Sequence, residues 1–120
     1  LYGYMTDSFH YLRDDCKAVL PADYTMLAAN QIKLFANFDK MRILEYLTLN
    51  GASCVSDIVA GIESEQLKVS QNLKRLRDDG FVVCHREGRY IIYDITPGVH
   101  KTAIQCIHKR YDSLKNKADF

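Results

Sequence analysis

Basic and amide side chains between residues 66 and 89 are the groups in this sequence best suited to bind a ligand. Amide and guanidinium groups can hydrogen-bond base edges, while hydroxyl and cationic groups bind phosphates. The residues of these types that we select are Gln66, Lys68, Ser70, Gln71, Lys74, Arg86 and Arg89. They predict a nucleic-acid partner, although a solvated helix face would have a similar composition.

The charge of the chain is unevenly distributed. The 120 residues have a formal net charge of +1, but residues 1–65 carry five Lys/Arg against nine Asp/Glu, a balance of −4. Residues 66–89 carry six against three, or +3, and residues 90–120 carry five against three, or +2. A local positive field attracts a polyanion even when the whole chain is nearly neutral.

The periodicity of apolar residues predicts the helix that would present these groups. Val69, Leu73 and Leu76 repeat at i, i+4 and i+7, so they face a core and turn the basic and amide groups outward. With Ser64 as its cap, this helix covers about residues 65–78 and follows a shorter one over about 54–60 that Ser53 can cap. Two helices so closely connected form a helix-turn-helix pair.

A β-hairpin and four further helices complete the predicted chain. Residues 81–95 contain two β-rich runs joined at Glu87-Gly88, which places Arg86 and Arg89 in a basic wing. Helices are expected over 6–20, 22–35 and 39–50, and a last one is capped by Thr96 and begins at Pro97. We therefore predict one mainly α domain over 1–120, a winged helix-turn-helix with N- and C-terminal dimerisation helices. Apolar stripes on the terminal helices favour a homodimer.

Several classes of protein are excluded by what the sequence lacks. No apolar run approaches the roughly 18 residues that span a bilayer, and no secretory signal is visible. The four cysteines have no regular spacing, which favours a cytoplasmic protein with reduced thiols. No nucleophile with a base and no paired carboxylates can be identified, so an enzyme is not expected.

Four stretches carry a resemblance to a known family: LFANFDKMRILEYL, SCVSDIV, VSQNLKRLRDDGFV and REGRYIIYDI. Their order and spacing resemble the ArsR/SmtB family of dimeric winged-helix repressors over about residues 34–95, with 1–21 as an N-terminal extension and 96–120 as a C-terminal dimer helix. Asn37-Phe38 replaces the usual Asp-Pro, and Asn72 replaces a His. The resemblance implies a homodimeric, sequence-specific DNA-binding repressor that an inducer releases from an inverted-repeat operator.

The resemblance also raises the question of an inducer site. Metal-sensing members carry a cysteine cluster in the helix before the recognition helix, and here only Cys54 of that cluster is present. Cys16 together with Cys54 is the tentative inter-subunit metal, metalloid or thiol-redox site, and packing is the alternative role for both. The cofactor is accordingly left open between a soft metal or metalloid ion and none. We expect Cys84 and Cys106 in the core, and the histidine pair of the family's zinc-type site is absent.

A second function class stays open alongside DNA-binding regulation. The same basic face could dock an acidic protein, which would make the chain a winged-helix protein-interaction module without operator binding. Steep salt dependence on duplex DNA would favour the regulator, whereas indifference to DNA would favour the interaction module.

Overall fold

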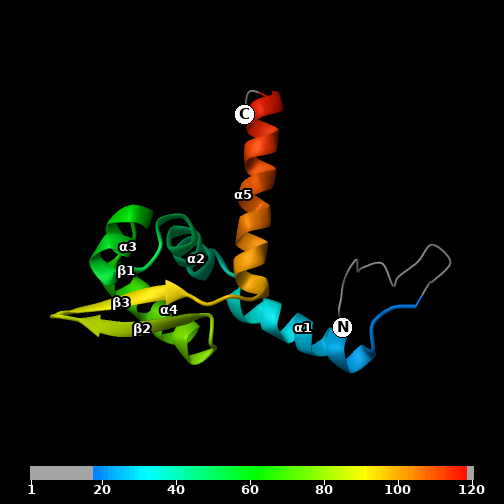
Figure 1. The fold of residues 1–120 in the computed structure, drawn as a ribbon, viewed down its shortest axis with the longest axis horizontal. Coiled ribbons are helices and arrows are strands. Elements are labelled where there is room, and N and C mark those ends of the chain that lie inside the picture. Colours follow the sequence, from blue (N-terminus) through cyan, green and yellow to red (C-terminus); the bar gives the residue numbers. More distant parts are fainter. Residues whose placement is uncertain (1–17, 119–120) are drawn as a thin grey trace. The chain divides into compact units, whose positions relative to one another are not determined.

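Five helices and three short strands follow one another along the chain. The computed structural model describes residues 18–118, and residues 1–17 and 119–120 lie outside this part. The elements are α1 (Ala22–Phe35), α2 (Phe38–Asn50), β1 (Ser53–Cys54), α3 (Val55–Ile62), α4 (Gln66–Asp78), β2 (Val82–Glu87), β3 (Tyr90–Ile95) and α5 (Val99–Ala118) (Figure 1). This order confirms the predicted winged helix-turn-helix.

Contacts divide the chain into two units, Leu1–Asn30 and Gln31–Phe120, and the second contains every element from α2 to α5. The helix predicted over 6–20 falls outside the described residues up to residue 17, and residues 18–20 carry no helix. The predicted extension at 1–21 therefore stays a prediction.

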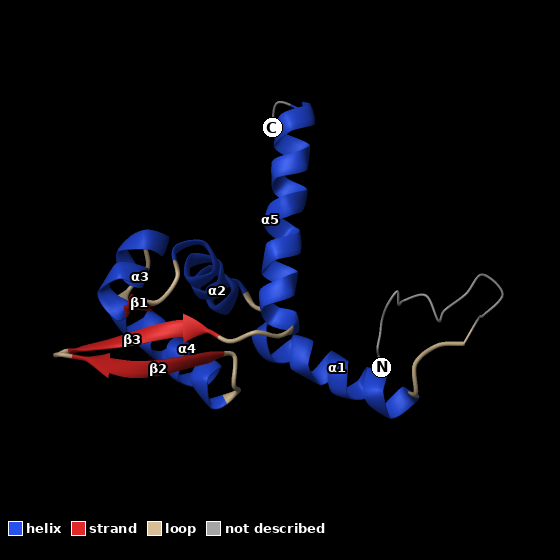
Figure 2. Cartoon of the chain, in the orientation of Figure 1, coloured by secondary structure: helices blue, strands red, loops and turns tan. Residues whose placement is uncertain are grey.

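The three strands form one antiparallel sheet in the order β1-β3-β2 (Figure 2). In the β2–β3 hairpin, Cys84 pairs with Tyr93 and Glu87 pairs with Tyr90. Gly88 turns the hairpin with φ 64°, a backbone conformation that glycine adopts without steric cost. The sheet thus holds the wing beside the helix-turn-helix, as the sequence predicted.

The core lies among α2, α3, α4 and the sheet, and α5 enters it by its first turns. Val69, Leu73 and Leu76 are buried, which confirms the predicted inner face of α4. The other buried apolar residues are Phe35, Ile43, Leu44, Leu47, Ile58, Phe81, Val82, Ile95 and Ile104. These contacts fix the orientation of α4 and therefore decide which of its side chains reach solvent.

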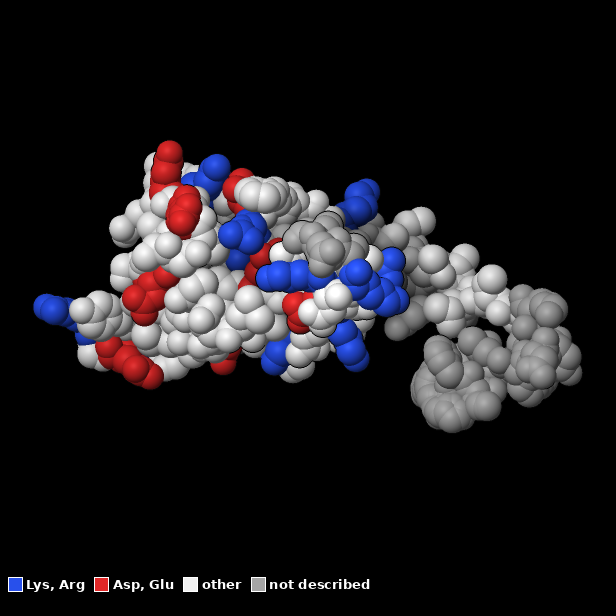
Figure 3. Space-filling model, turned by 90° about the horizontal axis from the view of Figure 1, so that it is seen from above, with Lys and Arg blue, Asp and Glu red and all other residues white. Residues whose placement is uncertain are grey.

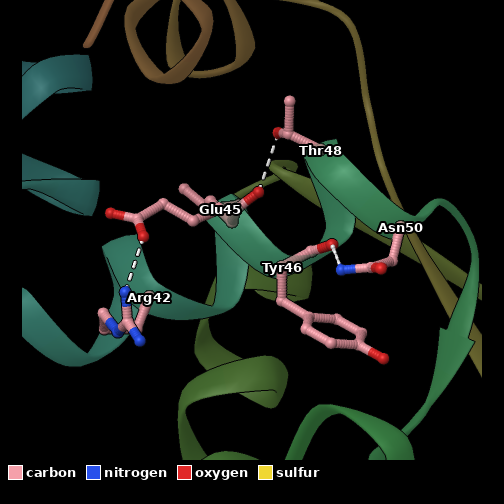
Figure 4. Close-up of polar contacts among 6 residues, drawn as sticks. Arg42, Glu45, Tyr46, Thr48 and Asn50 are labelled. Atoms are coloured by element: carbon pink, nitrogen blue, oxygen red, sulfur yellow. Dashed lines mark hydrogen bonds and ion pairs between the residues drawn. The ribbon is translucent and has the colours of Figure 1, made fainter. Parts of the chain in front are cut away.

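Half-buried polar side chains of α2 form hydrogen bonds within the helix itself. Arg42 Nη1 donates to Glu45 Oε1 at 2.8 Å, and Thr48 Oγ1 donates to the Leu44 carbonyl at 2.7 Å (Figure 4). Between α2 and α3 the approach is close, because a Cβ at position 61 would overlap the Tyr46 ring. Gly61 therefore allows the two helices to pack.

Three helix caps differ from those predicted from the sequence. Ser53 lies in β1, a strand that was not predicted, and its Oγ bonds the Gly51 carbonyl at 2.9 Å, while Cys54 is the N-cap of α3. The N-cap of α4 is Glu65, without a side-chain bond, so the predicted Ser64 cap is wrong. Thr96 does not cap α5, because its Oγ1 donates to the Gly80 carbonyl at 2.8 Å and α5 begins only at Val99.

The start of α2 shows how the chain replaces the family's usual Asp-Pro. Asn37 is the N-cap of α2, and its Oδ1 accepts a hydrogen bond from the Lys40 amide at 2.9 Å. An Asn side chain is among the preferred N-caps because it satisfies an otherwise unpaired amide of the first turn. The Lys40 ammonium bonds the Leu34 carbonyl at 2.9 Å and so ties the end of α1 to the start of α2.

Candidate nucleic-acid interface

The solvent side of α4 presents most of the residues selected from the sequence. Gln66, Lys68, Gln71 and Lys74 are exposed, and Ser70 is half-buried at the flank. At 3.6 residues per turn, positions 67, 71, 74 and 78 lie farthest from the buried face. We call this line of residues the outer ridge: Leu67, Gln71, Lys74 and Asp78. The ridge can enter a groove before any other part of α4.

Two of the selected lysines have carboxylate neighbours. Lys74 Nζ lies 3.6 Å from Asp78 Oδ2, one turn further along α4. Lys68 Nζ lies 3.5 Å from Asp39 Oδ1 in the first turn of α2, and these two side chains are 52% and 40% exposed. Exposed ion pairs of this length contribute little free energy, so the phosphates of a polyanion can displace the carboxylates. No sequence pattern indicates the contact between Lys68 and Asp39, which lie on different helices.

Asn72 stands where the family usually has a histidine. Its Nδ2 donates to the Lys68 carbonyl at 3.0 Å, along the same helix. The side chain is half-buried, so it lies beside the outer ridge rather than on it. Gln71, by contrast, is exposed on the outer ridge.

The tip of the wing carries Arg86 and Arg89, and both are exposed. Figure 3 shows Lys and Arg atoms at the far left, the horizontal position of the hairpin tip in Figure 1, with acidic atoms beside them. The Arg89 guanidinium lies 5.5 Å from the centre of the Tyr90 ring, a cation–π distance. On the other strand, His85 Nε2 lies 3.0 Å from Glu87 Oε2. The structure therefore brings both arginines to one turn.

A further cation joins α4 to the hairpin. Arg77 Nη1 lies 3.6 Å from Cys84 Sγ, and this hydrogen bond raises the pKa of the exposed Arg77, which stays cationic. Across the sheet, burial raises the pKa of Tyr93, which stays a neutral phenol. Arg77 is not among the residues selected from the sequence, because only the register of the hairpin brings Cys84 opposite the last turn of α4.

Of the two predicted site thiols, Cys54 lies within the described residues. Cys54 is half-buried, and its Sγ lies 3.2 Å from Ser56 Oγ. Cys16 lies outside the described residues, so the pair stays a prediction. Within residues 18–118, no group of three His, Cys, Asp or Glu side chains could hold a metal ion. Cys106 is exposed and Cys84 half-buried, so the expectation that both lie in the core is wrong.

One apolar stripe of α5 begins in the core and continues past it. His100 and Ile104 are buried, whereas Ile107 and Tyr111 on the same side are 44% and 49% exposed. Figure 1 shows the later turns of α5 extending beyond α2. Contiguous exposed apolar residues are typical of protein–protein contacts.

Where α5 enters the core, His100 packs against two aromatic rings. The ring centres of Phe35 and Phe81 lie 6.2 Å and 4.8 Å from that of the imidazole, and Nε2 lies 3.1 Å from Thr96 Oγ1. Burial lowers the pKa of His100, against the opposing effect of hydrogen bonds with the backbone of Phe81 and Thr96, and the charge of Lys101 lowers it further. The net effect favours the neutral imidazole.

Along the described part of the chain, no helix is long and apolar enough to cross a bilayer.

The helix-turn-helix, the outer ridge and the basic wing together define a winged-helix DNA-binding regulator.

Comparisons with known proteins identify the family. No family model matches the chain. It is 30% identical over 80 residues to an uncharacterized HTH-type transcriptional regulator of Methanocaldococcus jannaschii (67% of this chain, 90% of the relative) and 31% identical over 80 residues to the transcriptional activator HlyU of Vibrio cholerae (67% and 73%). It is 24% identical over 92 residues to the arsenical resistance operon repressor of Escherichia coli (77% and 79%). These relatives are transcriptional regulators, not enzymes.

Solved structures with a similar fold support the same family. Reduced HlyU from Vibrio cholerae superposes with a TM-score of 0.68 at 28% identity, covering 75% of this chain and 94% of that one. A homodimeric winged helix-turn-helix DNA-binding domain from Mycobacterium bovis shares the fold, with a TM-score of 0.63 at 23% identity and coverage of 85% and 94%. The chain belongs to the ArsR/SmtB family of winged-helix transcriptional regulators, as the resemblance of its motifs predicted.

Proposed function

We propose that a homodimer of this chain binds an inverted-repeat operator through α4 and the wing. The observation that carries the proposal is the outer ridge, which turns Gln71 and Lys74 away from the buried face of α4. Glutamine can bond adenine bidentately in the major groove, and the lysines can neutralise phosphates. We assign Gln66, Lys68, Ser70, Gln71 and Lys74 to bases and phosphates, and Arg86 and Arg89 to the backbone beside the groove.

The homodimer follows from the uncovered stripe of α5. Ile107 and Tyr111 continue the side of the helix that the core covers at Ile104, so a second copy of the same stripe would bury them. The likeness to a homodimeric domain from Mycobacterium bovis supports this arrangement. Two copies related by a two-fold axis would place their α4 helices in successive major grooves, with half-sites about 34 Å apart.

The direction of regulation that we propose is repression relieved by an inducer. The name of the Escherichia coli relative supports repression, and that of HlyU shows that a similar chain is called an activator. Cys16 and Cys54 stay the predicted response site, for a soft metal, a metalloid or a thiol oxidant. A Cys54→Ser variant that binds operator normally but no longer responds to any of these would support it. Because the partner is DNA, we place the protein in the cytoplasm.

Selection of duplexes from a random pool, followed by titration at several salt concentrations, tests the proposal. An inverted repeat should emerge, and Gln71→Ala should cost about 1–3 kcal/mol on that operator and much less on random duplex. Asn72→Ala is the matched control, because its amide is turned back along α4. Equal losses of affinity on both duplexes would show that Gln71 does not contact a base. Indifference of the wild type to DNA would favour the protein-interaction module instead.

A further inference from the structure

Leu67 is the apolar exception on the outer ridge of α4. Its side chain is 68% exposed, while the other members of the ridge are Gln71, Lys74 and Asp78. A single exposed leucine is common on protein surfaces and by itself needs no explanation. Its position is what distinguishes Leu67, because it lies one turn before Gln71 on the line of α4 that is farthest from the core.

The surroundings of Leu67 argue against a protein as its partner. Gln66 and Lys68 flank it in sequence and Gln71 follows it on the ridge, and all three are exposed polar or charged residues. A protein docking site is built from a contiguous apolar patch, and one leucine whose exposed neighbours along the helix are polar does not form one. The contact that suits Leu67 is therefore a small apolar group set among hydrogen-bonding groups.

The major groove offers one such group. Base edges there present hydrogen-bond donors and acceptors, and the C5-methyl of thymine is the apolar feature among them. Residues near the N-terminal end of a recognition helix are those that reach base edges, and Leu67 is the second residue of α4. Leucine has no donor or acceptor, so any discrimination it makes must come from burial of apolar surface.

We propose that Leu67 determines sequence specificity by packing against the methyl group of a thymine in each operator half-site. The inference rests on the proposed function, because it requires α4 to occupy a major groove. Gln71 would read the neighbouring base pair by hydrogen bonds, so the ridge would combine one apolar contact and one polar contact within a turn of helix.

Replacement of thymine by uracil tests this contact, because it removes the methyl group and leaves every hydrogen-bonding group of the base in place. Each thymine of the selected operator is replaced in turn, in both half-sites together. At one position the wild type should lose about fourfold in affinity per half-site, or about 15-fold in total, as burial of one methyl group predicts. Leu67→Ala should bind the thymine and uracil duplexes equally well.

Leu49→Ala is the matched control, since Leu49 is 65% exposed at the end of α2 and outside the ridge. This variant should keep the wild-type difference between thymine and uracil. Sensitivity that persists in Leu67→Ala, or a wild type that ignores every thymine methyl, would overturn the inference. If the wild type selects no duplex at all, the proposed function fails first, so the two failures are distinguishable.

Discussion

Helices α4 and α5 each leave one side uncovered, and the two sides differ in chemistry. On α4 the uncovered side is opposite the buried one and is the outer ridge of Leu67, Gln71, Lys74 and Asp78. On α5 it is the continuation of the buried side, where Ile107 and Tyr111 follow Ile104. A polar ridge is well solvated in water and can attract a polyanion. An apolar stripe is instead stabilised when another apolar surface covers it. One fold would thus separate the proposed contact with DNA from the proposed contact between subunits.

The largest effect on operator affinity is expected from a charge placed in the apolar stripe of α5. Ile107→Glu places a carboxylate in the proposed dimer interface, where an unpaired buried charge is costly. The dimer should dissociate, and operator affinity should fall by about 100-fold or more, because each α4 then binds without the other. Sedimentation equilibrium and operator titration measure the two effects.

Gln105→Glu adds the same charge at an exposed polar position of α5 and serves as the control. It should leave both the mass and the affinity unchanged. A fully dimeric Ile107→Glu variant would show that α5 does not hold the subunits together.

On the DNA side, the wing should contribute binding without sequence preference. Arg86→Ala or Arg89→Ala removes one phosphate contact from each half-site, so the slope of log affinity against log salt should flatten by about one unit per half-site, or about two units for the homodimer. Operator and random duplex should be weakened alike, because phosphate contacts carry no sequence information. Lys109→Ala, which removes an exposed cation of α5, should leave the slope unchanged. Losses confined to the operator would assign the arginines to bases.

A smaller effect is expected where α2 meets α4. Asp39→Asn removes the carboxylate that lies 3.5 Å from Lys68, so the lysine no longer leaves an ion pair to reach a phosphate. Affinity for DNA should rise by at most about fivefold per half-site, the range of exposed ion pairs. In a Lys68→Gln background the same substitution should change affinity much less. Weaker binding by Asp39→Asn would mean that the carboxylate orients Lys68 rather than competing for it.

The smallest effect is expected on the pH dependence of stability, through His100, which is buried in the first turn of α5. Because burial lowers the pKa of His100 in the fold, the unfolded chain binds the proton more readily. The stabilising contribution is therefore fully present above the ordinary histidine pKa of about 6.5 and is lost as the pH falls below it. Urea unfolding at about pH 7.5 and about pH 5 should show a larger loss for the wild type than for His100→Gln.

His85→Gln is the control for this measurement, because His85 is exposed on the wing. It should lose stability on acidification as the wild type does. An identical pH response of wild type and His100→Gln would show that the buried imidazole does not set the acid sensitivity.

The sequence by itself determined the elements whose signals are local. Val69, Leu73 and Leu76 repeat with the period of a helix, so they specified the inner face of α4 and, by exclusion, its outer ridge. Gly88 marked the tip of the hairpin because its positive φ suits glycine. These predictions held because each depends on residues a few positions apart, whose geometry the backbone fixes.

Only the tertiary structure decided how side chains with several local options are used. Ser53 and Thr96 both have the side chain of a helix cap, but Ser53 lies in a strand beside β3, and Thr96 reaches Gly80, 16 residues away. Lys68 is paired with Asp39 because α2 and α4 meet in the core, and Cys106 is exposed because it lies on the side of α5 opposite the buried Ile104. A hydroxyl, an ammonium or a thiol can satisfy several partners equally well, so packing of distant segments selects among them.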